Sequence, residues 1–294
     1  MILKHLTYLI ALADHRHFGR AADACHVSQP TLSMALKQME DELGVVLIER
    51  GHRFTRLTPE GEVVLTHARR IIAEGDEMRQ AIAEFKGGVG GRLRLGAIPT
   101  ALPMIARITG PFTTRYPAVT LTVTSMTSDE ILRGIRGFDL DIGVTYLETD
   151  ALDGLITKPI YREGYVLLVG ADDPVGALAS VTWAQAARAK LAMLTPDMQN
   201  RRILDGIFRS IGAAPQPAME TNSIFNLCTH AGVHGLSSIV PRQLLDVFGV
   251  PRGVVAVPLM EPDARRTVGL VAANRQPQAP LTRHLLATTD VIAD

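Results

Sequence analysis

Residues 18–43 read FGRAADACHVSQPTLSMALKQMEDEL, which predicts two short helices joined by a tight turn. In the first helix, from about Phe18 to Cys25, Ala21 and Ala22 form a narrow apolar face that lets another helix approach closely. Ser28 is a good N-cap for the second helix, whose apolar stripe is Leu32, Ala35, Leu36, Met39 and Leu43. This is the helix-turn-helix pattern, which can present its second helix to DNA.

The exposed face of the second helix carries amides, hydroxyls and one lysine, which suit base edges and phosphates in a major groove. A helical hairpin in a globular core is the alternative, because the shape alone is weak evidence. Residues 49–58 favour DNA binding, since three arginines on a short extended segment are typical of a wing that reaches the phosphate backbone. The candidate DNA contacts are Ser28, Gln29, Pro30, Thr31, Ser33, Met34, Lys37, Arg50, Arg53 and Arg56.

Residues 1 to about 61 resemble the DNA-binding domain of LysR-type transcriptional regulators. The matching residues are Phe18, Ala21, Ala22, Val27, Ser28, Gln29, Pro30, Leu32, Ser33, Glu40, Leu43, Gly44, Leu47, Arg50, Leu57, Thr58 and Gly61. The resemblance implies an α/β chain with an N-terminal winged helix-turn-helix, a long linker helix and a two-lobed effector domain similar to periplasmic binding proteins. Met34 departs from the family pattern, which more often has a polar or basic residue there, and a thioether cannot donate to a phosphate or guanine edge.

Residues 58–86 predict one long helix, with Thr58 as N-cap and Pro59 at the first helical position. Its seam residues recur at alternating spacings of three and four: Gly61, Val64, Ala68, Ile71, Gly75, Met78, Ile82 and Phe85. Such a heptad seam favours a dimerising helix over a helix buried within a monomer. In the family resembled, this helix pairs two winged domains. The glycines that follow predict a flexible hinge: Gly87, Gly88, Gly90 and Gly91.

Length and composition agree with a multidomain protein, since 294 residues that are 47% hydrophobic can form more than one core. We divide the chain into residues 1–58 (winged domain), 59–91 (linker helix and hinge) and 92–294 (effector domain). The 30 basic and 30 acidic residues balance, so net charge neither supports nor excludes DNA binding. Without a long apolar run or the features of a signal peptide, we expect a cytoplasmic protein with no membrane partner.

After the hinge, extended apolar runs alternate with helical stretches. Strands are expected at 93–98, 119–125, 140–145, 165–169, 191–194, 254–259 and 267–272, and helices at 102–116, 128–136, 201–211, 223–231 and 281–292. This order predicts parallel sheets that are covered by helices and form two small lobes. Ligands of such folds bind in the crevice beyond the carboxyl ends of the strands. The resemblance likewise implies a small molecule held between the lobes, with the chain crossing between them twice.

Candidate effector contacts are residues that follow expected strands: Pro99, Thr100, Ala101, Ser125, Met126, Thr127, Thr145, Tyr146, Thr195 and Asn222. The hydroxyl of Thr100 and nearby free N–H groups can bind a carboxylate or similar anion, and the resemblance places an effector contact at this position. For Ser128 and Ser223 we expect helix capping as the sole role. The adjacent Arg201 and Arg202 could neutralise an anion, but arginines at a helix start are more often solvated or ion-paired at the surface, which is what we expect of them.

Patterns of catalytic or metal-binding residues are missing from the sequence. It has no Gly-x-Ser-x-Gly, no phosphate-binding glycine loop and no cysteine pair with zinc spacing. We therefore expect neither an enzyme nor a cofactor other than a small-molecule effector. Some relatives sense peroxide through two cysteines in the effector domain, whereas here Cys25 lies in the winged domain and Cys228 stands alone. An intramolecular redox switch is not expected.

The leading interpretation is a ligand-responsive transcription factor that binds double-stranded promoter DNA and a small organic acid or other anion. The resemblance implies self-association, as a dimer through the linker helix and a tetramer through the effector domains, with RNA polymerase as a further candidate partner. The alternative is a cytosolic solute-binding protein or enzyme whose N-terminal domain serves only for assembly. Specific, salt-sensitive binding to one DNA site distinguishes the two.

Overall fold

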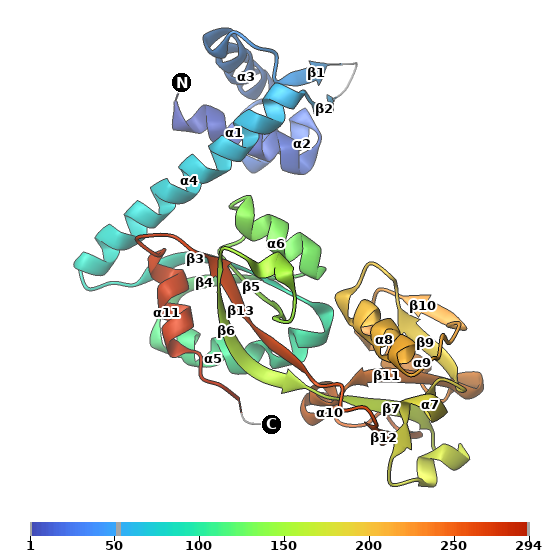
Figure 1. The fold of residues 1–294 in the computed structure, drawn as a ribbon. Coiled ribbons are helices and arrows are strands. Elements are labelled where there is room, and N and C mark those ends of the chain that lie inside the picture. Colours follow the sequence, from blue (N-terminus) through green and yellow to red (C-terminus); the bar gives the residue numbers. More distant parts are fainter. Residues whose placement is uncertain (1, 51–53, 293–294) are drawn as a thin grey trace. The chain divides into compact units, whose positions relative to one another are not determined.

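The computed structural model describes residues 2–50 and 54–292, which form two compact units (Figure 1). The first unit consists mainly of the residues up to Val89, and the second unit begins at Gly90. Among the described residues, no helix is both long enough and apolar enough to cross a bilayer.

The first unit contains the expected helix-turn-helix, preceded by one helix and followed by a two-stranded hairpin. Its elements are α1 (Leu3–His15), α2 (Phe18–Ala24), α3 (Gln29–Leu43), β1 (Ile48–Arg50) and β2 (Phe54–Leu57). At the start of α3, Ser28 Oγ accepts a hydrogen bond from the Thr31 N–H, as expected of an N-cap. Leu32, Leu36 and Met39 are fully buried, so the apolar stripe of α3 forms the centre of this unit's core.

The long helix α4 (Pro59–Phe85) follows the hairpin and begins at the expected cap. Thr58 Oγ1 accepts from the Gly61 N–H and donates to the Val46 carbonyl. Glycine is required at position 61, because a Cβ there would lie 2.2 Å from the carbonyl oxygen of Leu47. The first turns of α4 pack into the core, whereas four large seam residues are exposed on the described chain: Ile71, Met78, Ile82 and Phe85.

The second unit is built on two sheets. Lobe I has the strand order β4-β3-β5-β13-β6, and lobe II has the order β10-β9-β11-β7-β12-β8. The lobe I strands are β3 (Gly90–Ala97), β4 (Ala118–Ser125), β5 (Ile142–Tyr146), β6 (Leu155–Glu163) and β13 (Arg266–Ala273). The lobe II strands are β7 (Tyr165–Gly170), β8 (Val181–Thr182), β9 (Lys190–Leu194), β10 (Met219–Thr221), β11 (Leu236–Pro241) and β12 (Val254–Met260).

Helices follow several of these strands in both lobes. Those of lobe I are the 3-10 helices η1 (Pro99–Met104) and η2 (Asp150–Leu152), with α5 (Ile105–Arg115), α6 (Ser128–Arg136) and α11 (Pro280–Thr288). Those of lobe II are η3 (Pro174–Ala177), α7 (Trp183–Ala186), α8 (Gln199–Ser210), α9 (Ile224–His230), η4 (Val233–Gly235) and α10 (Arg242–Phe248). The chain crosses between the sheets of the two lobes from β6 to β7 and again from β12 to β13.

The expectation of parallel sheets is wrong, because both sheets are mixed. In lobe I, β13 pairs antiparallel with β5 and β6, and in lobe II, β7 pairs antiparallel with β11 and β12. The strands β6, β8, β10 and β11 lie outside the runs expected from the sequence. Pro159 interrupts the apolar pattern of β6 and coincides with a register shift against Gly269, which is where a strand tolerates proline.

Several expected boundaries also differ. Gly90 and Gly91 belong to β3, where they pair with Ala118 and Val119 of β4, so they are not part of a hinge. Glycine at position 90 permits the close approach of β3 to β4, since a Cβ there would lie 3.3 Å from Ala118. The last helix ends at Thr288 instead of Ile292, since Thr289 has an extended backbone and the Ile292 N–H donates to the Ile160 carbonyl of β6.

Candidate functional site

The start of α3 presents most of the proposed DNA contacts to solvent. Ser28, Gln29, Pro30, Thr31, Met34 and Lys37 are exposed, and Ser33 is half-buried. Lys37 Nζ lies 3.4 Å from Asp41 Oδ1, one turn further along the helix. Such an exposed pair contributes little to stability, so the lysine can exchange its partner for a phosphate. Met34 is 69% exposed, which leaves an apolar side chain in the middle of this polar face.

The wing carries one described arginine side chain, Arg56 of β2. Its guanidinium donates to both carboxylate oxygens of Glu49 on β1, at 2.7 and 3.0 Å. The two residues are directly paired across the hairpin, and the hydrogen bonds from Arg56 lower the pKa of the Glu49 carboxyl. The expected contact at Arg53 lies outside the described residues, as does the side chain of Arg50.

Glu40 of α3 fixes the β1–β2 hairpin to that helix, a role that the sequence did not reveal. The side chain is buried, and its Oε1 accepts from the backbone N–H groups of Leu47 and Ile48, at 3.0 and 3.2 Å. These two donors lie where the chain turns from α3 into β1. One carboxylate therefore sets the position of the hairpin relative to the helix that would read DNA.

In the second unit, a small pocket of about 10 Å³, enough for about one water molecule, is lined by residues of both lobes. Its lining residues are Ile98, Pro99, Thr100, Thr127, Ser128, Tyr146, Leu194, Met198, Gln199 and Asn200. They come from the carboxyl ends of β5 and β9, from the segment after β3 and from the starts of η1, α6 and α8. The polar groups of this lining are hydroxyls and side-chain amides, and none is a lysine or arginine.

Hydrogen bonds within the lining join the two lobes. Tyr146 of β5 is buried, and its hydroxyl lies 3.1 Å from Thr100 Oγ1. The same hydroxyl accepts from Asn200 Nδ2 of α8, in the other lobe, also at 3.1 Å. Beside it, Thr145 Oγ1 donates to Ser128 Oγ at 2.9 Å. A ligand that reaches these groups contacts both lobes at once.

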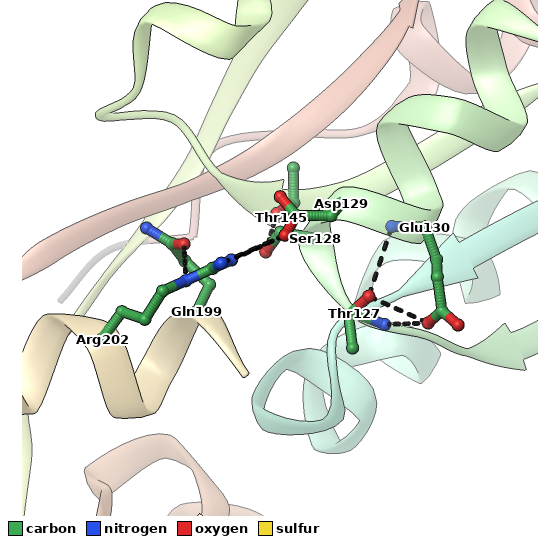
Figure 2. A network of polar contacts seen from close by, with 7 residues as sticks. All are labelled: Thr127, Ser128, Asp129, Glu130, Thr145, Gln199 and Arg202. Atoms are coloured by element: carbon green, nitrogen blue, oxygen red, sulfur yellow. Dashed lines mark hydrogen bonds and ion pairs between the residues drawn. The ribbon is translucent and has the colours of Figure 1, made fainter. Parts of the chain in front are cut away.

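A second contact between the lobes lies at the surface (Figure 2). Arg202 of α8 donates two hydrogen bonds of 3.1 Å to Asp129 of α6, and its Nε donates to Gln199 Oε1 at 2.9 Å. Both charged side chains are about half exposed, so the ion pair contributes on the order of 0 to 1 kcal/mol. It is a contact that can break when the lobes move.

The structure brings four of the ten predicted effector contacts into this pocket: Pro99, Thr100, Thr127 and Tyr146. Thr145 bonds to the pocket residue Ser128. The remaining five are not among its lining residues: Ala101 is buried in η1, Met126 and Thr195 are half-buried, and Ser125 and Asn222 are exposed. The other six lining residues are not among the ten candidates, although Met198 ends a segment, residues 195–198, that follows an expected strand: Ile98, Ser128, Leu194, Met198, Gln199 and Asn200. α8 begins at Gln199, two residues before the expected helix, and this earlier start carries the amides into the pocket.

Two expected roles are wrong. Thr127 caps α6, with its Oγ1 accepting from the Glu130 N–H, so Ser128 is free to face the pocket and accept from Thr145. Arg201 is 8% exposed and not at the surface, since it bonds to Asp205, to Glu220 and to the Leu194 carbonyl. Ser223 does cap α9, as expected.

The two cysteines lie in different units and are both half-buried. Burial raises the pKa of the Cys25 and Cys228 thiols, which lowers the fraction of reactive thiolate at neutral pH. In the described part of the chain, no group of three or more His, Cys, Asp or Glu residues is arranged to hold a metal ion.

Family comparisons match both units. Residues 3–62 match the family described as bacterial regulatory helix-turn-helix protein, lysR family, and residues 86–290 match the LysR substrate binding domain. The chain belongs to the LysR family of transcriptional regulators. It is therefore a DNA-binding transcriptional regulator with an effector-binding domain, and the alternative of a solute-binding protein or enzyme is set aside.

Relatives of this LysR-type regulator match nearly the whole chain. The chain is 30% identical over 282 residues to the DNA-binding transcriptional dual regulator OxyR of Escherichia coli K12, and the match covers 96% of this chain and 91% of OxyR. A structure of a full-length OxyR variant from Pseudomonas aeruginosa matches with a TM-score of 0.77 and 27% identity, over 98% of this chain and 94% of that chain. CbnR in complex with its target DNA has the same fold, with a TM-score of 0.72 at 23% identity over 98% and 99% of the chains.

Proposed function

We propose that this regulator holds its effector, a small organic acid or other anion, in the pocket around Thr100, and that occupancy changes promoter binding. The observation that carries this proposal is the hydrogen-bonded set Thr100, Tyr146 and Asn200, which joins the two lobes at the pocket wall. The starts of α6 and α8 add the partial positive charge of helix N-termini, which favours an anion where no cationic side chain lines the pocket.

Replacing Thr100 with valine tests the site. Valine keeps the shape of threonine but removes the hydroxyl, so an effector oxygen loses a hydrogen-bond donor. We expect effector affinity to fall by about five- to 150-fold, corresponding to roughly 1 to 3 kcal/mol. A thermal-shift screen of small carboxylates identifies the effector, because a ligand of the native state raises its stability.

Calorimetry with that effector then compares wild type and Thr100→Val. Asn222→Ala is the matched control, since Asn222 is exposed and does not line the pocket. Equal affinity of wild type and Thr100→Val would remove this residue from the site.

For DNA recognition, we propose that Gln29 and Ser33 read base edges while Lys37 and Arg56 contact phosphates. Gln29→Ala should cost about 1 to 3 kcal/mol on the preferred promoter site and leave binding to random DNA unchanged. Arg56→Ala should weaken binding to both DNAs and lower the salt dependence by about one phosphate contact. Gel-shift titrations on both DNAs measure this difference, and equal losses on the two DNAs for Gln29→Ala would show that it does not read bases.

For assembly, we propose a dimer through the exposed seam of α4, with further association of effector domains into a tetramer. The support is a row of large apolar side chains at heptad spacing that the described chain leaves in solvent, among them Met78 and Ile82. We also propose a cytoplasmic location, where promoter DNA is accessible, and RNA polymerase as a partner at the promoter.

Several relatives are named hydrogen peroxide-inducible genes activators. We infer that this regulator does not use a disulfide within the effector unit, because Cys228 is the only one of its two cysteines in that unit. The raised pKa of the Cys228 thiol further disfavours fast oxidation. A dissociable effector remains the proposed signal.

A further inference from the structure

Glu163 is a buried carboxyl group at the point where the chain passes between the lobes. It is the last residue of β6 in lobe I, and after Gly164 the strand β7 of lobe II begins (Figure 1). Its side chain is fully buried, and Oε1 accepts a 2.5 Å hydrogen bond from the Tyr146 hydroxyl. Among the described residues, Oε2 of Glu163 and Oδ1 of Asn200 are buried without a hydrogen-bond partner.

The surroundings of Glu163 are polar but contain little positive charge. Tyrosines face it from three strands: Tyr146 on β5, Tyr161 on β6 and Tyr165 on β7. Neutral Thr100 and Asn200 approach it from η1 and α8. From β13, Arg266 is the register partner of Glu163, and its charge acts on Tyr165.

Burial raises the pKa of the Glu163 carboxyl to about 7, and the hydrogen bond from Tyr146 opposes that rise. Burial likewise raises the pKa of all three tyrosines, so they stay protonated. Glu163 is thus the member of this cluster that changes charge near neutral pH.

A chain of hydrogen bonds connects Glu163 to the pocket through Tyr146 and Thr100. Each of the two hydroxyls has one hydrogen, and either oxygen of the Thr100–Tyr146 pair can be the donor. When Glu163 is ionised, Tyr146 donates to it, Thr100 donates to Tyr146, and Thr100 offers the pocket only lone pairs. When Glu163 is protonated at Oε1, its hydrogen points to Tyr146, Tyr146 donates to Thr100, and the Thr100 hydroxyl donates into the pocket.

We propose that Glu163 determines whether Thr100 is a donor or an acceptor in the pocket, so that a carboxylate effector binds together with one proton. This inference rests on the proposed effector pocket. The proton comes from solvent and forms an O–H bond on Glu163, while the two hydroxyl hydrogens only rotate. A carboxylate has acceptors alone, so it requires the donor arrangement, whereas a primary amide can satisfy either arrangement.

The first test needs no effector. Infrared difference spectra of the full chain between pH 5.5 and 8.5 should show one carboxylic acid signal lost with a midpoint near pH 7. The signal should be missing in Glu163→Gln, which mimics the protonated side chain. The melting temperature of wild type should fall as the pH rises through 7, because the buried Glu163 side chain then carries a charge. The melting temperature of Glu163→Gln should not show this fall. If the Glu163 carboxyl keeps one protonation state between pH 5.5 and 8.5, the proposal is overturned.

The second test compares acetate with acetamide as probes of the same size, using thermal shifts at constant ionic strength. Acetate is ionised at both pH 6 and pH 8.5, so changes in its affinity report on the protein. Only the protonated fraction binds acetate, and we therefore expect affinity for wild type to be about 30-fold weaker at pH 8.5. Acetamide should bind equally at the two pH values.

Two variants separate the proton link from the site. Glu163→Gln fixes the donor arrangement and should bind acetate equally well at pH 6 and 8.5, whereas Tyr146→Phe breaks the chain of hydroxyls and should also lose the pH dependence. Wild-type acetate affinity that is equal at both pH values, or no acetate binding at all, overturns the proposal. If acetamide still binds in a Thr100-dependent way, the effector pocket itself stands and only the proton link fails.

Discussion

Replacing both Ile71 and Met78 with glutamate should separate the paired α4 helices and lower promoter affinity by about 10²- to 10⁴-fold, the usual gain from joining two binding modules. These two residues are 40% and 62% exposed on the described chain and lie seven residues apart on the seam. In a paired helix they would be buried, and four glutamates facing each other there would be desolvated without partners. Sedimentation of the full chain and gel-shift titration measure the two effects.

The matched control adds the same two negative charges off the seam, as Val63→Glu with Thr66→Glu. Both positions are exposed on α4 and lie outside the heptad positions. The control should sediment like wild type and keep nearly all of its promoter affinity. If the seam variant assembled and bound DNA like this control, α4 would not be the dimer interface.

Removing the carboxylate of Glu40 should destabilise the first unit by about 2 to 5 kcal/mol. Glu40→Ala leaves the N–H groups of Leu47 and Ile48 without their acceptor in a buried place. Glu40→Gln keeps an oxygen that can accept from both N–H groups, so this variant should lose less stability than Glu40→Ala. Denaturant unfolding, monitored by far-UV circular dichroism, measures the change in the free energy of unfolding of this unit.

The single tryptophan supplies an internal control for that measurement. Trp183 is buried in the core of lobe II, so its fluorescence follows the second unit. The fluorescence transition should remain at its wild-type position in both Glu40 variants. If Glu40→Ala changed stability by less than about 0.5 kcal/mol, the buried hydrogen bonds would not anchor the wing.

The helix-turn-helix and the long helix were predictable because their signals are local. Ser28 and Thr58 cap helices within three residues of the N–H groups that they accept from, and the apolar stripe of α3 repeats at helical spacing. The two-lobed arrangement followed from alternating strands and helices together with the family resemblance. Its antiparallel pairs were not predictable, because no local pattern tells β13 to insert between β5 and β6.

The pocket was only partly predictable for the same reason. Thr100 follows β3 and Tyr146 ends β5, so both could be named from that rule, but their partner Asn200 lies 54 residues beyond Tyr146 in the other lobe. Arg201, expected at the surface, is buried and ion-paired with the half-exposed Glu220, a partner 19 residues away that no local pattern reveals. Glu163 could not be singled out, because β6, the strand that it ends, was not expected and the tyrosines around it come from three strands.

We expect an effector in the pocket between the lobes and promoter DNA on α3 to influence each other's binding. The most direct measurement is the effector dissociation constant of the full chain, by calorimetry, with and without saturating promoter DNA. Coupling between two sites is reciprocal, so DNA should change effector affinity by the same factor by which effector changes DNA affinity, about 5- to 150-fold. Identical effector affinities in the two conditions would contradict the account.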